Sequence, residues 1–170
     1  LDAAMVIVAV AGGHGGTYGN GKPLPPDLGV DRIAYVDLDG RVFTVAPDGQ
    51  DRIAVSPEEG FFTWPTWSPD GRRLVISGVV QDDDGNSIAE LYARNTVTGV
   101  LRRLHAGVSG QTTIVAERAP HYPYWSPDGN RIAFIGGSPE GLKLSLDDLR
   151  DGEAPAFALG TGRIGAASGS

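Results

Sequence analysis

The sequence predicts an all-β protein built from about three four-stranded antiparallel sheets. Glycine (25 residues) and proline (12 residues) are frequent in the 170-residue chain, which suits short strands joined by tight turns. Short runs rich in β-branched residues recur between Asp-Gly turns, and one ten-residue segment occurs twice. A chain of this length is long enough for one domain with a sizeable core and too short for two.

Individual strands are expected where apolar and polar residues partly alternate between turn residues. No sustained helical period follows Asp31. In the first half of the chain, the expected strands are 32–36, 41–45, 52–56 and 73–77. In the second half, they include 91–94, 101–104 and 142–146.

A repeated sequence segment indicates how the strands are grouped into sheets. The two copies are Trp67-Ser68-Pro69-Asp70-Gly71 and Trp125-Ser126-Pro127-Asp128-Gly129, each followed by an apolar strand, and their offset is 125 − 67 = 58 residues. A four-stranded β-propeller blade takes roughly 40–45 residues. The 13 residues 108–120 have no turn signal and no counterpart elsewhere, and removing them leaves 58 − 13 = 45. The spacing therefore predicts propeller blades with one long inserted loop.

Each residue of the repeat has a physical role. Ser-Pro-Asp-Gly is typical of a hairpin turn, because proline presets φ, aspartate accepts backbone hydrogen bonds and glycine adopts a left-handed conformation. The preceding tryptophan is expected on the innermost strand. There its large flat ring can fill the wedge between neighbouring blades.

The two copies, with Pro65-Thr66 and Pro123-Tyr124 before their tryptophans, resemble the repeat of the TolB-like β-propeller family, which is also seen in prolyl-oligopeptidase-family propellers. The resemblance implies a non-catalytic scaffold, periplasmic or at the cell surface, that binds other proteins and uses no cofactor. Two alternatives stay open. The chain could be the substrate-gating propeller of a prolyl-oligopeptidase-like serine peptidase, or the sensor ectodomain of a membrane-anchored signalling protein.

The chain divides into four segments. Residues 1–11 are predicted to be the remnant of a signal peptide or membrane anchor, because Ala9-Val10-Ala11 matches a signal-peptidase site. A buried strand is the alternative for this apolar run. Residues 12–30 are a Gly/Pro-rich linker that could tether the protein to a membrane. Residues 31–165 are the blades, at about 31–63, 64–107 and 121–160, with blade one starting directly at its second strand, and 166–170 are a tail.

Composition limits the partners and the chemistry. The net charge of −7 and the pI near 4.8 argue against binding of nucleic acid. The chain has no cysteine, which excludes disulfides and thiolate metal sites. Gly16–Lys22 has the spacing of a phosphate-binding loop, but Pro23 follows and prevents the helix that such a loop needs. His14-Gly15-Gly16 resembles an esterase oxyanion loop, yet no Gly-x-Ser-x-Gly elbow is present, so no catalytic residue is assigned.

Acidic loops are predicted to collect on one face. In four-stranded antiparallel blades, the connections after the second and fourth strands emerge on the same face. There they bring nine acids and one base, a net charge of −8, against −7 for the whole chain. The predicted binding residues on this face are Glu58, Glu59, Phe61, Phe62, Asp82, Asp83, Asp84 and Glu117. The expected partner is a basic protein, while the simpler interpretation is that the acids only keep the protein soluble. No metal site is assigned, because the Asp82–Asp84 run lacks the spacing of a calcium loop.

The number of blades predicts an open arc. Propellers close with four to eight blades, and about three are encoded here. We expect the ring to be completed by a longer chain or by a second copy in a homodimer.

Overall fold

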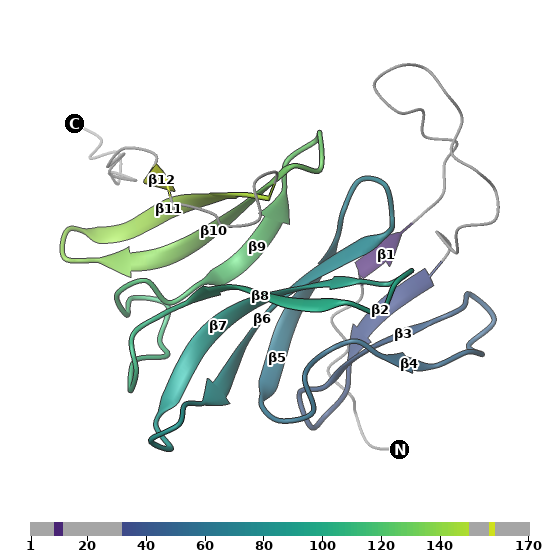
Figure 1. Ribbon diagram of the computed structural model, residues 1–170, viewed down its shortest axis with the longest axis horizontal. Helices are drawn as coiled ribbons and strands as arrows, with labels where there is room; N and C mark the ends of the chain where they lie inside the picture. Colours follow the sequence, from purple (N-terminus) through teal and green to yellow (C-terminus); the bar gives the residue numbers. More distant parts are fainter. Residues whose placement is uncertain (1–8, 12–31, 150–156, 159–170) are drawn as a thin grey trace, which may run out of the picture.

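The computed structural model describes residues 9–11, 32–149 and 157–158, and these contain 12 strands and no helix. The strands form three four-stranded antiparallel sheets, each with its strands in sequence order (Figure 1). The first sheet, blade one, holds β1 (Ala9–Ala11), β2 (Arg32–Val36), β3 (Val42–Val45) and β4 (Ile53–Ala54). Blade two holds β5 (Phe61–Trp67), β6 (Arg73–Gln81), β7 (Ser87–Asn95) and β8 (Leu101–Ala106). Blade three holds β9 (His121–Trp125), β10 (Arg131–Ser138), β11 (Gly141–Asp148) and β12 (Phe157–Ala158).

The three sheets follow one another along an arc, with blade two in the middle (Figure 1). The first strands β1, β5 and β9 are neighbours, so they form the inner side of the arc. This arrangement is that of consecutive β-propeller blades. The predicted all-β propeller fold is therefore confirmed. In this part of the chain no helix is long and apolar enough to cross a membrane.

Blade one differs from the prediction, because it has a first strand. Ala9–Ala11 pairs with β2 in the register Ala9↔Ala34 to Ala11↔Arg32. The apolar run that was assigned to a signal or anchor remnant thus ends in a strand that completes the sheet. Residues 1–8, the linker 12–30 and the tail 166–170 lie outside the described residues, and their assignments stay predictions.

Both Ser-Pro-Asp-Gly segments form the predicted hairpin turns. In the first, the Ser68 hydroxyl donates to Asp70, and the Asp70 carboxylate also accepts from the Arg72 amide at 3.1 Å. The second repeats this pattern with Ser126, Asp128 and the Asn130 amide. Gly71 and Gly129 have φ of +67° and +69°, the left-handed region in which glycine is favoured.

The Asp128 carboxylate should make the fold sensitive to acid. Hydrogen bonds from the Ser126 hydroxyl and the Asn130 amide lower the pKa of Asp128 from 3.8 to about 2. A carboxyl with a lowered pKa stabilises the fold above its unfolded pKa and loses that contribution as pH falls toward the folded value. We expect Asp128→Asn to destabilise the protein at pH 7, with the difference from wild type vanishing between pH 4 and about 2. Urea unfolding at several pH values measures this, with the exposed Asp51→Asn as the control.

The core lies between the blades. One cluster joins Ala34, Val36, Val42 and Val55 of blade one to Phe62, Leu74 and Ile76 of blade two. A second joins Val75 and Leu91 of blade two to Ile132 and Phe134 of blade three. Trp67 packs against the first cluster and Trp125 against the second, so each tryptophan lies between blades as the repeat predicted.

Candidate functional site

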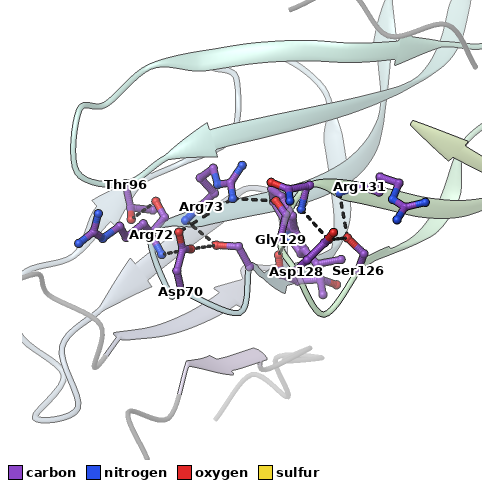
Figure 2. Close-up of polar contacts among 12 residues, drawn as sticks. Asp70, Arg72, Arg73, Thr96, Ser126, Asp128, Gly129 and Arg131 are labelled. Atoms are coloured by element: carbon purple, nitrogen blue, oxygen red, sulfur yellow. Dashed lines mark hydrogen bonds and ion pairs between the residues drawn. The ribbon is translucent and has the colours of Figure 1, made fainter. Parts of the chain in front are cut away.

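The loops predicted to be acidic emerge at one edge of the three sheets. The register of the strands places 37–41, 57–60, 82–86, 107–120 and 139–140 at this edge, which we call the loop face. The two Ser-Pro-Asp-Gly turns and the turn 46–50 lie at the opposite edge, the turn face (Figure 2 shows the two Ser-Pro-Asp-Gly turns). The loops that strand parity assigned to one face therefore lie at one edge of the fold. Because the first turn includes Arg41, they carry nine acids and two bases, a net charge of 2 − 9 = −7.

Contacts between loops join all three blades across the loop face. Between blades one and two, the Phe62 amide donates to the Gly40 carbonyl at 2.7 Å. Between blade two and the long loop 108–120, the Ser109 hydroxyl donates to Asp82 and the Gly110 amide donates to the Ser87 carbonyl. At blade three, the Gly137 amide donates to the Ala116 carbonyl at 3.0 Å.

The long loop is anchored by close packing. Ala116 and Ala119 are buried against Ala89 of β7. A Cβ added at Gly137 would lie 2.1 Å from the Val115 carbonyl oxygen, so only glycine lets the loop backbone approach β10 this closely. The His105 side chain contacts the loop, because its Nε2 lies 3.1 Å from the Arg118 carbonyl oxygen. Burial lowers the pKa of His105. The loop is thus a fixed part of the loop face.

The structure separates the two predicted phenylalanines. Phe61 is 53% exposed at the start of β5, beside Gly40. Phe62 is fully buried in the cluster between blades one and two, with its ring 5.9 Å from that of Tyr92. Its prediction as a binding residue is wrong, because adjacent residues of a strand point to opposite sides of the sheet. The first strand of blade two begins at Phe61, three residues earlier than predicted. Phe61 and Phe62 are therefore strand residues and not loop residues, and their side chains point to opposite faces of the sheet.

The predicted acids also differ in what they do. Asp82 closes its own turn by accepting from the amides of Asp84 and Asn86, and the Ser109 hydroxyl is the largest cause of its lowered pKa. The other five predicted acids are exposed on the loop face: Glu58, Glu59, Asp83, Asp84 and Glu117. Within residues 9–11, 32–149 and 157–158, no group of three or more carboxylates and histidines is placed to hold a metal.

Sequence reasoning missed apolar residues among these acids. Leu38 is 59% exposed at the tip of the 37–40 turn, and Val115 is 68% exposed in the long loop. Both lie on the loop face with Phe61. The signal for Leu38 was present, because a leucine between the two aspartates of a tight turn cannot point into the sheet. Arg52 was also missed. It adds a base near this face by pairing with Asp37 at 3.5 Å.

The inner strands carry an unpredicted aromatic pair. Trp64 of β5 and Tyr122 of β9 have φ of +54° and +51°, and their ring centroids are 4.4 Å apart. They are 58 residues apart, the offset of the repeat, and each precedes a proline. Left-handed backbone at such bulky residues costs on the order of 1–3 kcal/mol and is often found where a protein contacts a ligand. The pair is partly exposed and lies on the inner side of the arc.

Comparisons with known proteins agree with the fold. No family model matches the sequence. A segment of 95 residues is 34% identical to the uncharacterized peptidase YuxL of Bacillus subtilis (strain 168), covering 56% of this chain and 12% of that protein. Among solved structures, an oligogalacturonate lyase in complex with manganese matches with a TM-score of 0.53 and 19% identity, over 79% of this chain and 34% of that one. A TolB from Agrobacterium tumefaciens, described as putative, matches with a TM-score of 0.46 and 15% identity, over 74% and 44%.

These similarities concern the fold. At 19% identity, the likeness to the lyase shows a shared architecture and no shared chemistry. The chain spans about an eighth of the length of YuxL and about a third of the lyase chain. The described residues have a β-propeller fold, as the repeat predicted.

Proposed function

We propose that this chain is a non-catalytic, extracytoplasmic binding scaffold that recognises a basic protein through its loop face. The observation that carries the proposal is the composition of that face. Exposed apolar side chains (Leu38, Phe61 and Val115) lie on the same edge as exposed acids from all parts of the arc. Protein interfaces combine an apolar centre with a polar rim, and long loops on a rigid scaffold are common recognition elements.

The architecture supports binding more than chemistry. His105 and His121 lie at the ends of β8 and β9 that adjoin the long loop, and burial lowers the pKa of both. The His105 Nε2 lies 3.1 Å from the Arg118 carbonyl oxygen of that loop. The Trp-Ser-Pro-Asp-Gly repeat, which resembles that of TolB-like propellers, supports an extracytoplasmic location and protein partners for the chain.

Site-specific crosslinking tests the proposal. A photo-crosslinking residue at the exposed Glu59 probes the loop face, and the same residue at the exposed Asp48 probes the turn face. In the native host, we expect a defined protein adduct at position 59 and none at position 48. Adducts at both positions, or at position 48 alone, would contradict the proposal.

Two exposed acids should control the rate of association. Asp83 and Asp84 accept no side-chain hydrogen bond from another described residue, so replacing both with asparagine removes charge without opening the turn that Asp82 closes. We expect the double variant to slow association with the crosslinked partner about tenfold at low salt, with an effect that shrinks as salt rises. The melting temperature should stay near that of wild type.

The matched control removes two exposed acids from the turn face. Asp48 and Asp51 are both exposed, and Asp51 has a φ of +54°, which asparagine tolerates. Asp48→Asn/Asp51→Asn changes the net charge by the same amount. Equal slowing by both double variants would mean that only the total charge matters and not the loop face.

A second candidate function is the propeller of a prolyl-oligopeptidase-like serine peptidase. The 34% identity over 95 residues to an uncharacterized peptidase favours it. A fluorophosphonate probe, which labels activated serine nucleophiles, distinguishes the two functions when applied to the native protein isolated from its host with an antibody to the blades. Labelling would support the peptidase, and its absence the scaffold.

A further inference from the structure

Two histidines bracket the long loop 108–120. His105 lies at the end of β8, shortly before the loop, and His121 is the first residue of β9, directly after it. Both lie beside β10: the ring centroids of His105 and Phe134 are 4.7 Å apart, and His121 pairs with Ile135. Histidine is the side chain whose charge changes near neutral pH, and the part of the chain that the structure describes holds only these two. Both therefore lie where the loop leaves and re-enters the blades.

The His105 ring fits its place in the neutral form. Its Nε2 lies 3.1 Å from the Arg118 carbonyl oxygen, and because a carbonyl only accepts, Nε2 carries the proton of the neutral ring. A second proton, at Nδ1, makes the ring a partly buried cation packed against Phe134. Burial is the largest cause of the lowered pKa of His105, and the positive charge of Arg118 adds to it, while the bond to the Arg118 carbonyl opposes both.

The His121 ring has no place for a second proton. Its Nε2 is buried and has no hydrogen-bond partner among the described residues. A neutral ring can leave this nitrogen unprotonated, whereas the charged ring carries an N–H there that no described group accepts. The loop backbone at Thr112 and Thr113 favours the charged ring by hydrogen bonding, but burial has the larger effect and lowers the pKa of His121.

The charges around the two rings do not favour a cation. The charged residues of the elements packed against the rings are Glu117 and Arg118 of the loop, Glu90 and Arg94 of β7, Arg102 and Arg103 of β8, and Arg131 of β10. Glu90 is engaged by Arg103 at 2.8 Å and by Tyr92, which packs on the cluster with blade one and so on the other side of the sheet from Phe134. The other arginines of the strands lie toward the turn face. Of the charges in this part of the structure, only that of Arg118 contributes to a histidine pKa shift, and it repels a second proton.

We propose that His105 and His121 form a pH-sensitive switch, which holds the long loop on blade three at neutral pH and releases it in mild acid. A group whose pKa is lowered in the docked state stabilises that state above its ordinary value of 6.5, and this contribution is lost as the pH falls below 6.5. Release of the loop opens both rings to water, which solvates their charged forms.

The anchor that opposes release is small. The buried residues of the loop are Ala116, Ala119 and Pro120. At its start the loop stays attached to blade two, because the Ser109 hydroxyl donates to Asp82. The pKa of Asp82 lies below 3.8, so this carboxylate keeps its charge in the range in which the histidines titrate. The loop should therefore detach at its blade-three end.

The switch concerns the fold, and its functional consequence rests on the proposed function. Val115 and Glu117 belong to the loop, so its release removes them from the loop face, and a partner bound there should dissociate in mild acid. Hydrogen exchange of the isolated protein needs no partner. Its result is therefore independent of whether the loop face binds a protein.

Amide hydrogen exchange of the full chain, followed by NMR between about pH 7.5 and pH 5, tests the switch. The reporters are the Arg118 and Gly137 amides, which bond the loop to blade three at 3.1 and 3.0 Å. After correction for the intrinsic pH dependence of exchange, their protection should fall at least about tenfold, because one titrating histidine changes an equilibrium by up to about tenfold per pH unit. Protection should persist at two control amides, Ser126 at the turn face of blade three and Gly110 at the start of the loop.

Variants without a titratable ring identify the groups. His105→Gln and His121→Gln keep a polar side chain, so each should remove part of the pH dependence and the double variant all of it. In the wild type, NMR signals of both rings should titrate below 6.5. Equal protection of the reporters at both pH values would overturn the proposal, as would titration of both rings at or above 6.5, a fall in protection shared by Ser126, or a fall that persists in the double variant. The wild-type measurements decide the matter even where a variant fails to fold.

Discussion

Replacing Trp125 with alanine is expected to cost on the order of 3–5 kcal/mol of unfolding free energy, the usual range for deleting a large ring from a packed core. The ring packs on the cluster between blades two and three, receives the Arg73 guanidinium at 4.6 Å and donates to the Thr66 carbonyl. All three interactions cross the boundary between blades. Denaturant unfolding measures the loss, and Trp67→Ala should give a loss of the same order.

Two control variants show how much of the loss comes from the hydrogen bond of Trp125 and how much from its place between the blades. Trp125→Phe keeps an aromatic ring but removes the hydrogen bond to Thr66, so we expect a smaller loss, of which about 1 kcal/mol belongs to that bond. Trp64→Ala removes a tryptophan that is 37% exposed and contacts Tyr122 outside the clusters. Similar small losses for all three alanine variants would mean that the tryptophans do not join the blades.

Phe62→Ala is expected to destabilise the protein by about 3–5 kcal/mol, because it removes a fully buried ring and leaves a cavity between blades one and two. The space around the ring is fully used. A Cβ added at Gly78 of β6 would lie 2.2 Å from the Phe62 Cδ1, so the β6 backbone packs directly on the ring. Filling the cavity left by alanine would require that backbone to shift. Thermal and denaturant unfolding should both report the loss.

Its neighbour provides the contrast. Phe61→Ala truncates a ring that is 53% exposed, so we expect a small change in stability. If the loop face binds a protein, Phe61→Ala should instead weaken that binding. A large loss of stability from Phe61→Ala, or a small one from Phe62→Ala, would contradict the placement of the two rings.

The repeat made the blades predictable from the sequence. The pairing of strands that are far apart in the sequence was not predictable. Trp-Ser-Pro-Asp-Gly specifies a turn locally, and its offset specifies the blade, so β6 and β10 could be placed without a structure. Ala9–Ala11 could not, because its partner β2 begins 21 residues after Ala11 and no local turn joins them. Short alanine and valine runs occur equally in signal sequences and in strands.

The candidate site was predictable only in part. Strand parity correctly placed the acidic loops on one edge, since each blade repeats the same up-and-down path. It misplaced Phe62, because the strand begins at Phe61 and the irregular pairing between Thr63 and Thr66 breaks simple alternation. The left-handed backbone at Trp64 and Tyr122 lies where the pairing of β5 with β6 and of β9 with β10 is irregular, and such local irregularities are not specified by the apolar alternation on which the strands were predicted.

The anchoring of the long loop has a consequence for how the molecule opens. Residues 108–120 bond to Asp82 and Ser87 of blade two and to Gly137 of blade three, while Arg73 ties the same two blades at the opposite edge. Every sheet ladder stays within its own blade. In proteins made of such units, cooperativity passes from neighbour to neighbour. Blades two and three should therefore exchange their amide hydrogens as a single unit, and blade one should open before them.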